Sequence, residues 1–358
     1  MRGAPLSLGG ACLLAALLAA CATRPSPPAG FAQLRGWERE DHRAVVQVFR
    51  DGCGVAKDAA VRAVCDRARA FEPRNDAAAR RFLERNFRVE AIEGEGLLTA
   101  YFTPQYEARA RREGEFSRPV VAGGFRGAQV RQEGELSRAA FAPSLREMIF
   151  PDTRERKSIE TDPRLESRAL AWMRPEELFF MQLQGSAVLS FPEGRVMKAV
   201  TVSTNNRPFV GIAKVMRERG LLADGDTSGE AIMAWLAVHR GPEADEIMRQ
   251  NPRYGFFRLE PFTGSISGAA GVPLAPGRAI AVDPGSHAYG GLYWVDADAP
   301  ALRGAVQSYR RAVVALDTGG AIKGAVRADL YLGQGAAAGR EAGRVRHRLR
   351  LYHLVPVR

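Results

Sequence analysis

The chain has 358 residues, of which 46% are hydrophobic and 25% charged, a composition that excludes a disordered chain and indicates a globular protein. Its length exceeds what one compact core usually holds, and its four cysteines are too few for a disulfide-stabilised scaffold, so we expect two domains or one large one. The formal net charge of +11 leaves nucleic acid, a membrane surface and an acidic polymer as candidate partners.

The first 20 residues predict a secretory signal peptide. Arg2 precedes an apolar run over residues 11–18 that is too short for a permanent membrane anchor. The run ends in Leu18-Ala19-Ala20-Cys21, which resembles the lipobox of bacterial lipoproteins, where the cysteine is acylated and becomes the new N-terminus. We therefore expect residues 1–20 to be removed, Cys21 to carry lipid and residues 21–37 to form a lipid-anchored linker.

Export would leave Cys53 and Cys65 in an oxidising compartment. The two cysteines could pair or remain as buried thiols, because their spacing in the sequence does not give their separation in space. No later stretch approaches the length and hydrophobicity of a transmembrane helix.

The remaining elements follow from the periodicity of apolar residues. Residues 38–87 predict short helices, and residues 97–104 have the composition of a strand. The stretch 105–165 is rich in Arg, Gly and Pro and predicts strands with long loops, and two helices are predicted over 212–219 and 229–240. The final hundred residues are short apolar runs interrupted by Gly and Pro, as in β structure.

Several familiar sites are absent from the sequence. It has no His-Glu-x-x-His motif, no Cys-x-x-Cys pair and no Gly-x-Ser-x-Gly motif, and its five histidines are scattered, so we expect no metal site. The glycines of residues 333–339 do not fit a dinucleotide loop, because the third is one position late and the chain ends 19 residues later. We expect no cofactor.

Three aspartates near the C-terminus are the candidates for chemistry. Asp283 and Asp317 end apolar runs, where Asp is common as a turn residue. Asp329 lies in mid-strand, and strand alternation places it on one face with Arg327 and Tyr331, opposite the apolar side chains. The single Asp-Thr-Gly triplet at Asp317 would make an aspartic protease only in a homodimer, because that chemistry needs two such carboxylates.

The region around these aspartates resembles the three-aspartate (3D) signature of the membrane-bound lytic murein transglycosylase A (MltA) family. The matching segments are Ala281-Val-Asp283-Pro284, Asp317-Thr-Gly-Gly-Ala-Ile-Lys-Gly324, Arg327-Ala-Asp329-Leu-Tyr331, Gly96–Pro104, Phe179–Ser186, Asn205–Phe209 and Asn251–Phe257. Ala187 departs from the family's last glycine of Gln-Gly-Ser-Gly, and Asn206 replaces a glycine whose positive φ an asparagine can adopt. Residues 285–294 also differ from the family's usual turn. These departures affect loops and leave the aspartates in place.

The resemblance implies a mainly β fold with N-terminal helices. A double-psi β-barrel, the catalytic 3D domain, would be built from residues 38–106 and 258–358. A second β-rich barrel domain, which binds substrate, would be inserted over residues 107–257, with a groove between the two domains.

The resemblance also implies a peptidoglycan lytic exotransglycosylase, a lyase that cleaves the β-1,4 bond between N-acetylmuramic acid and N-acetylglucosamine without water and leaves 1,6-anhydro ends. The nucleophile is then the substrate's own C6 hydroxyl, so one carboxyl group can act as acid and afterwards as base. By position Asp329 takes this role, Asp317 supports or orients it, and Asp283 completes the catalytic set with a more structural part. The residues themselves leave open whether bonds at chain ends or in mid-chain are preferred.

The resemblance implies further contacts and a location. The candidates for sugar contacts are Thr99, Tyr101, Gln184, Gly185, Ser186 and Lys323. The implied partners are peptidoglycan strands, the membrane through lipid on Cys21, and other cell-wall enzymes, on the periplasmic side of the outer membrane of a Gram-negative bacterium. Nucleic acid is not expected for an exported chain.

The positive charge is concentrated at the C-terminus, where residues 340–358 hold six arginines and one glutamate. Arg344, Arg346, Arg348 and Arg350 alternate with other residues and form one face of a final strand. This face is either the solvated edge of a sheet or a surface for an anionic partner such as peptidoglycan. Two other functions stay open, a hydrolase of the same bond and a non-catalytic wall-binding module on a double-psi barrel.

Overall fold

The computed structural model describes residues 30–123, 153–223 and 226–357. The expected signal peptide and the lipidation site at Cys21 lie outside these ranges. Within the described ranges, no helix combines the length and the hydrophobicity that crossing a membrane requires.

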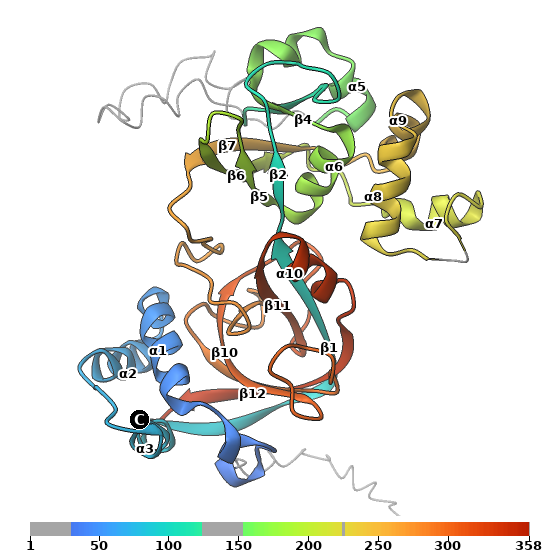
Figure 1. Ribbon diagram of the computed structural model, residues 1–358. Coiled ribbons are helices and arrows are strands. Elements are labelled where there is room, and N and C mark those ends of the chain that lie inside the picture. The colour runs from blue at the N-terminus through green and yellow to red at the C-terminus, as the bar shows by residue number, and fades with distance from the viewer. Residues whose placement is uncertain (1–29, 124–152, 224–225, 358) are drawn as a thin grey trace, which may run out of the picture.

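The regular elements are distributed over the whole described chain (Figure 1). The helices are α1 (His42–Gly52), α2 (Ala59–Arg69), α3 (Asp76–Asn86), α5 (Arg156–Glu160), α6 (Pro175–Gln184), α7 (Ile212–Glu218), α8 (Gly229–Val238), α9 (Pro242–Arg249) and α10 (Gly335–Ala342), with 3-10 turns such as η3 (Cys53–Val55). The strands are β1 (Phe87–Thr103), β2 (Gln105–Glu107), β3 (Arg118–Val121), β4 (Ala169–Met173), β5 (Ser186–Ser190), β6 (Val196–Thr204), β7 (Gly255–Pro261), β8 (Ala279–Ala281), β9 (Leu292–Ala297), β10 (Tyr309–Asp317), β11 (Arg327–Gln334) and β12 (Arg346–Pro356).

Six strands close into a barrel in the order β1-β11-β8-β10-β9-β12. The pairs β1–β11 and β8–β10 are parallel, and the other neighbours are antiparallel. Alternate side chains fill the barrel interior, among them Leu98, Ile280, Val313 and Leu330, and they are fully buried. This arrangement confirms the expected mainly β fold with a barrel assembled from the two ends of the chain.

The segment between β1 and β8 forms the second β-rich unit, which lies above the barrel in Figure 1. It holds a four-stranded sheet, β2-β5-β6-β7, and a two-stranded sheet, β3-β4. Single bridges from Ala122 to Phe257 and from Arg109 to Trp172 link the two sheets at both sides, so they enclose a core of their own. Strands of this unit run from Gln105 to Pro261; the domain junctions expected at residues 107 and 257 stay predictions.

The N-terminal helices α1, α2 and α3 pack on the outside of the barrel, at the lower left of Figure 1. Each helix is preceded by a residue whose side-chain oxygen accepts a hydrogen bond from a backbone amide of the first turn: Asp41, Asp58 and Asn75 respectively. A disulfide joins Cys53 of η3 to Cys65 of α2, which the sequence had left open.

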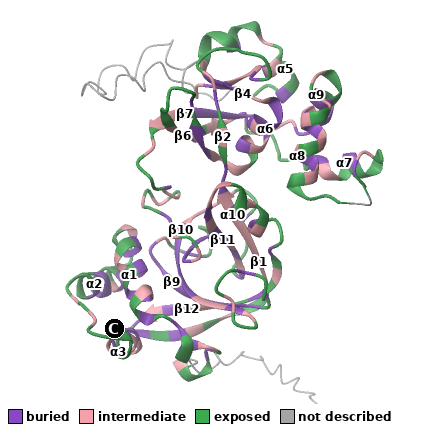
Figure 2. Ribbon diagram, viewed as in Figure 1, coloured by how far each residue is buried: buried purple, intermediate pink, exposed green. Residues whose placement is uncertain are grey.

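The pairing of the last strand contradicts one of the two interpretations of its arginine face. β12 pairs with β1 on one side and with β9 on the other, so the expectation of a solvated sheet edge is wrong. Barrel closure is the reason, because it gives every strand two neighbours. The alternation itself is as expected: Leu349 and Leu351 are buried, while Arg348 and Arg350 are exposed. Figure 2 shows buried and exposed stretches along β12.

Strand β1 begins at Phe87, ten residues before the stretch that its composition predicts. The segment Glu93-Gly94-Glu95 forms a bulge in β1, where the register between β1 and β12 shifts between Ile92 and Gly96. A Cβ on Gly96 would lie 2.3 Å from a methyl carbon of Val326, so the close approach of β1 and β11 requires glycine.

Candidate active site

The outer wall of the barrel brings the two central aspartates into one row. Thr99, Asp329, Ala281 and Asp317 lie in register on the neighbouring strands β1, β11, β8 and β10. Two strand spacings separate Asp317 from Asp329, so their Cα atoms are roughly 10 Å apart. Ala281 lies between them in the ladder.

The carboxyl group of Asp329 is held by a chain of two hydrogen bonds. The hydroxyl of Thr99 donates to Oδ1 of Asp329, and Nη2 of Arg327 donates to Thr99 Oγ1 at 2.8 Å. A hydroxyl has one hydrogen, so accepting from Arg327 directs that hydrogen to Asp329. Oδ1 is therefore an acceptor, and Oδ2, which receives no hydrogen bond from the described residues, is the oxygen that can carry a proton.

The surroundings of Asp329 favour its protonated form. Burial raises the pKa of its carboxyl above the ordinary value, and the negative charge of Asp317 raises it further. The Thr99 hydrogen bond and the positive charge of Arg327 oppose this increase without cancelling it. A carboxyl group with a raised pKa keeps its proton closer to neutral pH, as a general acid must.

The carboxylate of Asp317 accepts three hydrogen bonds. The amides of Thr318 and Ala269 donate to Oδ1 at 2.9 and 2.8 Å, and the hydroxyl of Tyr101 donates to Oδ2 at 2.7 Å. Burial and the negative charge of Asp317 raise the pKa of Tyr101 well above its usual range, so the phenol stays a donor. The ring of Tyr101 packs at a tilt against Tyr331, with centroids 5.3 Å apart.

Asp283 connects two loops away from this row. Its Oδ1 accepts from Gly285 N at 3.1 Å and its Oδ2 from Gly324 N at 2.8 Å, and these amides hold the pKa of its carboxyl below the ordinary value. Lys323 lies beside it, with Nζ 3.7 Å from Oδ1. The structure thus places Lys323, a predicted sugar contact, next to Asp283 and not in contact with Asp329.

The predicted sugar contacts of the second unit lie at the junction of the two units. Gln184 ends α6, Gly185 follows with φ +84°, and Ser186 begins β5. Gln184 lines a cavity of about 610 Å³ together with Ala100 and Phe102 of β1, among other residues. Because side chains alternate along a strand, this cavity opens on the other face of β1 from Thr99 and Tyr101. No described contact joins Gln184, Gly185 or Ser186 to Asp329.

The structure adds residues that the sequence did not single out. The loop carrying Ala269 packs against Asp317, and a Cβ on Gly268 would lie 2.5 Å from the carbonyl oxygen of Leu316, so this approach needs glycine. From the second unit, Arg253 reaches the loop after β10: a Cβ on Gly320 would lie 3.9 Å from Arg253 Nη1. Backbone donors and contacts between distant segments have no signature in the sequence, so Gly268 and Ala269 could not have been predicted. Arg253 lies in the segment Asn251–Phe257, which is the one sequence signal that could have identified it.

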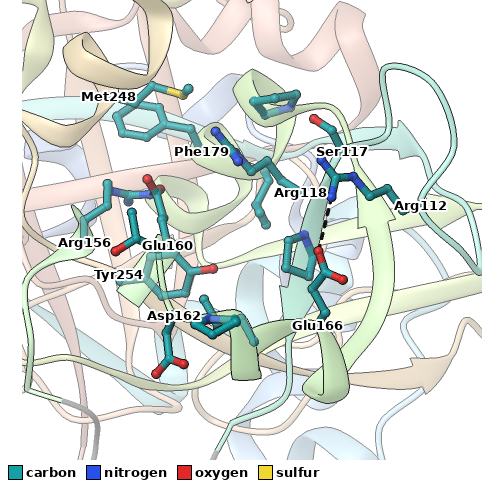
Figure 3. A pocket seen from close by; sticks show the side chains of 16 residues that line it. Arg112, Ser117, Arg118, Arg156, Glu160, Asp162, Glu166, Phe179, Met248 and Tyr254 are labelled. Atoms are coloured by element: carbon teal, nitrogen blue, oxygen red, sulfur yellow. Dashed lines mark hydrogen bonds and ion pairs between the residues drawn. The ribbon is translucent and has the colours of Figure 1, made fainter. Parts of the chain in front are cut away.

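A further cavity, of about 270 Å³, lies within the second unit (Figure 3). Its arginines are paired with carboxylates: Arg112 with Glu166 at 3.2 Å, Arg118 with Asp245, and Arg156 with Glu160 at 3.1 Å. None of the predicted site residues lines it, and its charges neutralise one another. Among the described residues, no group of three or more His, Cys, Asp and Glu side chains is arranged to hold a metal ion.

Comparison with known proteins relates both units to one family. The MltA specific insert domain matches residues 97–258, and the 3D domain matches residues 278–355. A curated relative, membrane-bound lytic murein transglycosylase A of Escherichia coli strain K12, is 29% identical in an alignment of 283 residues that covers 75% of this chain and 70% of the relative.

Solved structures agree with these matches. The crystal structure of MltA from Neisseria gonorrhoeae in its monoclinic form is similar with a TM-score of 0.74 and 28% identity, covering 92% of this chain and 92% of that one. The crystal structure of E. coli MltA with bound chitohexaose is similar with a TM-score of 0.66 and 25% identity, covering 89% and 90%.

Proposed function

The chain belongs to the MltA family and is a lytic transglycosylase of peptidoglycan, and we propose that it cleaves the bond between N-acetylmuramic acid and N-acetylglucosamine with Asp329 as its acid and base. The observation that carries this proposal is the state of Asp329, which combines a raised pKa, one oxygen fixed by Thr99 and one oxygen free for a proton. A relative with a bound chitohexaose supports a glycan as the ligand.

The proposed reaction consumes no water. The proton on Oδ2 of Asp329 passes to the leaving O4 as the bond from C1 to O4 breaks, and positive charge develops at C1. The C6 hydroxyl of the same N-acetylmuramic acid then bonds to C1, and the carboxylate of Asp329 takes the proton from O6. The products are a 1,6-anhydro end and a free O4 hydroxyl, and the enzyme regains its protonated acid.

The other site residues support this carboxyl group in the proposal. The negative charge of Asp317, held by three donors, raises the pKa of Asp329 and favours the positive charge of the transition state. Arg327 orients the Thr99 hydroxyl. Asp283 keeps two loops together, while Tyr101, Lys323 and the residues Gln184, Gly185 and Ser186 remain proposed sugar contacts.

The location is proposed along with the reaction. The curated relatives are named as membrane-bound, which supports a membrane-associated enzyme of a Gram-negative bacterium. We infer that lipid on Cys21 holds the chain at the periplasmic side of the outer membrane, where it meets peptidoglycan and other cell-wall enzymes. Replacement of Cys21 by Ser should abolish both the lipidation and the removal of residues 1–20, so that the unprocessed precursor accumulates.

A digest of purified sacculi tests the reaction. The parent is expected to release muropeptides with 1,6-anhydro ends, and Asp329→Asn is expected to release none. Asp298→Asn is the matched control, because Asp298 is an exposed aspartate of the same barrel. Products heavier by one water would indicate a hydrolase, and binding of sacculi without release would indicate a wall-binding module; either result would overturn the proposed function.

A further inference from the structure

Strand β12 presents three arginines on the outer wall of the barrel. Arg346, Arg348 and Arg350 are exposed, whereas the alternating Leu349 and Leu351 point into the barrel core. We refer to these three arginines as the arginine track. Because β12 is hydrogen-bonded on both sides, the track has no role in protecting a free sheet edge.

The arginine track has few partners of opposite charge: Asp296 lies opposite Arg350 in the ladder between β12 and β9, but its carboxylate pairs with Arg35 and Arg310. Among the described residues, no carboxylate forms an ion pair with Arg346 or Arg350, and Arg348 reaches Glu95 only at 3.6 Å, with side chains 90% and 95% exposed. By contrast, the arginines around the cavity in Figure 3 all have carboxylate partners. Neighbouring like charges on one face of a strand repel one another, so the folded chain gains no stability from this arrangement.

The arginine track begins beside the catalytic row. Arg346 lies opposite Thr99 in the ladder between β12 and β1, and Thr99 lies opposite Asp329 in the ladder between β1 and β11. Directly opposed residues share a face of the sheet, so Arg346 continues the row from Asp317 through Asp329. Arg350 then lies roughly 13 Å further along β12.

We propose that the arginine track binds carboxylates of the peptide stems carried by the glycan, so that the enzyme prefers peptide-bearing peptidoglycan to peptide-free strands. This inference rests on the proposed function. The stem is attached to N-acetylmuramic acid, the sugar whose C1 reacts, so a glycan bound over Asp329 brings carboxylates near the track. Guanidinium groups bind carboxylates with two parallel hydrogen bonds, which suits arginine better than lysine for this role.

The position of the arginine track favours peptidoglycan over a membrane as its partner. An anionic bilayer resting on Arg346, Arg348 and Arg350 would also cover the adjacent face that carries Thr99 and Asp329. A glycan could not then reach the acid. A peptide stem leaves that face open because it is part of the substrate itself.

The test compares two substrates, intact sacculi and glycan strands freed of peptides by an amidase. The variant Arg348→Gln/Arg350→Gln leaves Arg346 and the catalytic row unchanged. We expect its kcat/KM on sacculi at low ionic strength to fall about fivefold, from the loss of two exposed charge pairs, with no change on peptide-free strands. Raising the salt concentration should remove most of the difference between parent and variant.

A matched control is Arg81→Gln/Arg85→Gln, which removes the same charge from two exposed arginines of α3. The control should behave as the parent on both substrates. The charge-reversed variant Arg348→Glu/Arg350→Glu should lose more activity on sacculi than the Gln variant and still cleave peptide-free strands.

For the variant, three results would overturn the proposal: equal loss on both substrates, loss on neither, or unchanged digestion with reduced binding to vesicles that contain phosphatidylglycerol. The last result would assign the track to a membrane. If the parent released no anhydro products from either substrate, the proposed function itself would fail. If it cleaved both substrates equally well, only the role of the arginine track would fail.

Discussion

Replacement of Thr99 by Val isolates the hydrogen bond that orients the acid. Valine has nearly the same shape as threonine and suits a strand, so the change removes the hydroxyl and little else. Asp329 Oδ1 then loses its donor, and Arg327 Nη2 loses its acceptor. The guanidinium keeps its bonds to the carbonyl oxygens of Ala328 and Leu97, at 2.6 and 3.4 Å, so it stays in place.

The magnitude follows from the kind of hydrogen bond that is lost. A hydrogen bond to a charged group contributes about 1.5–3 kcal/mol, and loss of the lower value from transition-state positioning lowers kcat about tenfold. The Thr99 hydroxyl lowers the pKa of Asp329, so Thr99→Val raises this pKa further. The acid stays protonated to higher pH, and the alkaline limb of the kcat/KM profile moves to higher pH.

The assay is the pH dependence of anhydro-muropeptide release by parent and Thr99→Val. Thr103→Val is the matched control on the same strand, because its hydroxyl makes only a long contact of 3.5 Å with Tyr331 and none with an aspartate. We expect the control to keep the alkaline limb of the parent. An unshifted or acid-shifted limb in Thr99→Val would refute the assignment of the Thr99 hydrogen bond to the reacting carboxyl group.

The remaining predictions concern stability. Because burial raises the pKa of Asp329, the folded state binds more protons than the unfolded state, and stability falls as pH rises from the unfolded-state pKa to the folded-state pKa. Asp329→Asn should therefore have a higher Tm than the parent at pH 7. The difference in Tm should disappear below pH ~4, where the carboxyl group is protonated in both states. A lower Tm of this variant at pH 7 would contradict the buried acid. Tyr101→Phe removes one of three donors to Asp317 and should lower the free energy of unfolding by about 2 kcal/mol in urea titrations, whereas no change would mean that the bond at 2.7 Å is not formed in solution. Cys53→Ser/Cys65→Ser opens a loop with a sequence separation of 12 and should lower the free energy of unfolding by about 3 kcal/mol in the same assay. The variant should keep the kcat of the parent, because the disulfide lies in the N-terminal helices. Equal stability of the parent with and without reductant would argue against the disulfide.

Asp317 and Asp329 lie on the same outer face of the barrel but have different surroundings, which suit them to different roles. Asp317 accepts hydrogen bonds from three donors, two of them backbone amides, which fix the orientation of its carboxylate. Asp329 has a single donor, and burial raises the pKa of its carboxyl, which suits a group that holds a proton.

Much of the local structure could be predicted from the sequence. The alternation of Asp329 with Ala328 and Leu330 predicted a carboxyl group presented from mid-strand, and the helices α7 and α8 match the predicted ranges closely. Four other helices, α5, α6, α9 and α10, were not predicted. α10 contains two glycines, which have low helix propensity, and it forms where Phe102 packs closely over Gly339.

The sequence by itself determined which faces of the strands are apolar, where the aspartates sit on them and which family signature they form, because these properties depend on spacing along the chain. Only the tertiary structure decided that Asp317, Asp329, Thr99 and Arg346 form one row, since they come from four strands that meet only when the barrel closes. Because the barrel closes, the basic C-terminal strand is hydrogen-bonded to a neighbour on each side and is not the edge of a sheet. The pKa of Asp329 depends on the same event, because burial and the charge of Asp317 act through space and not along the chain.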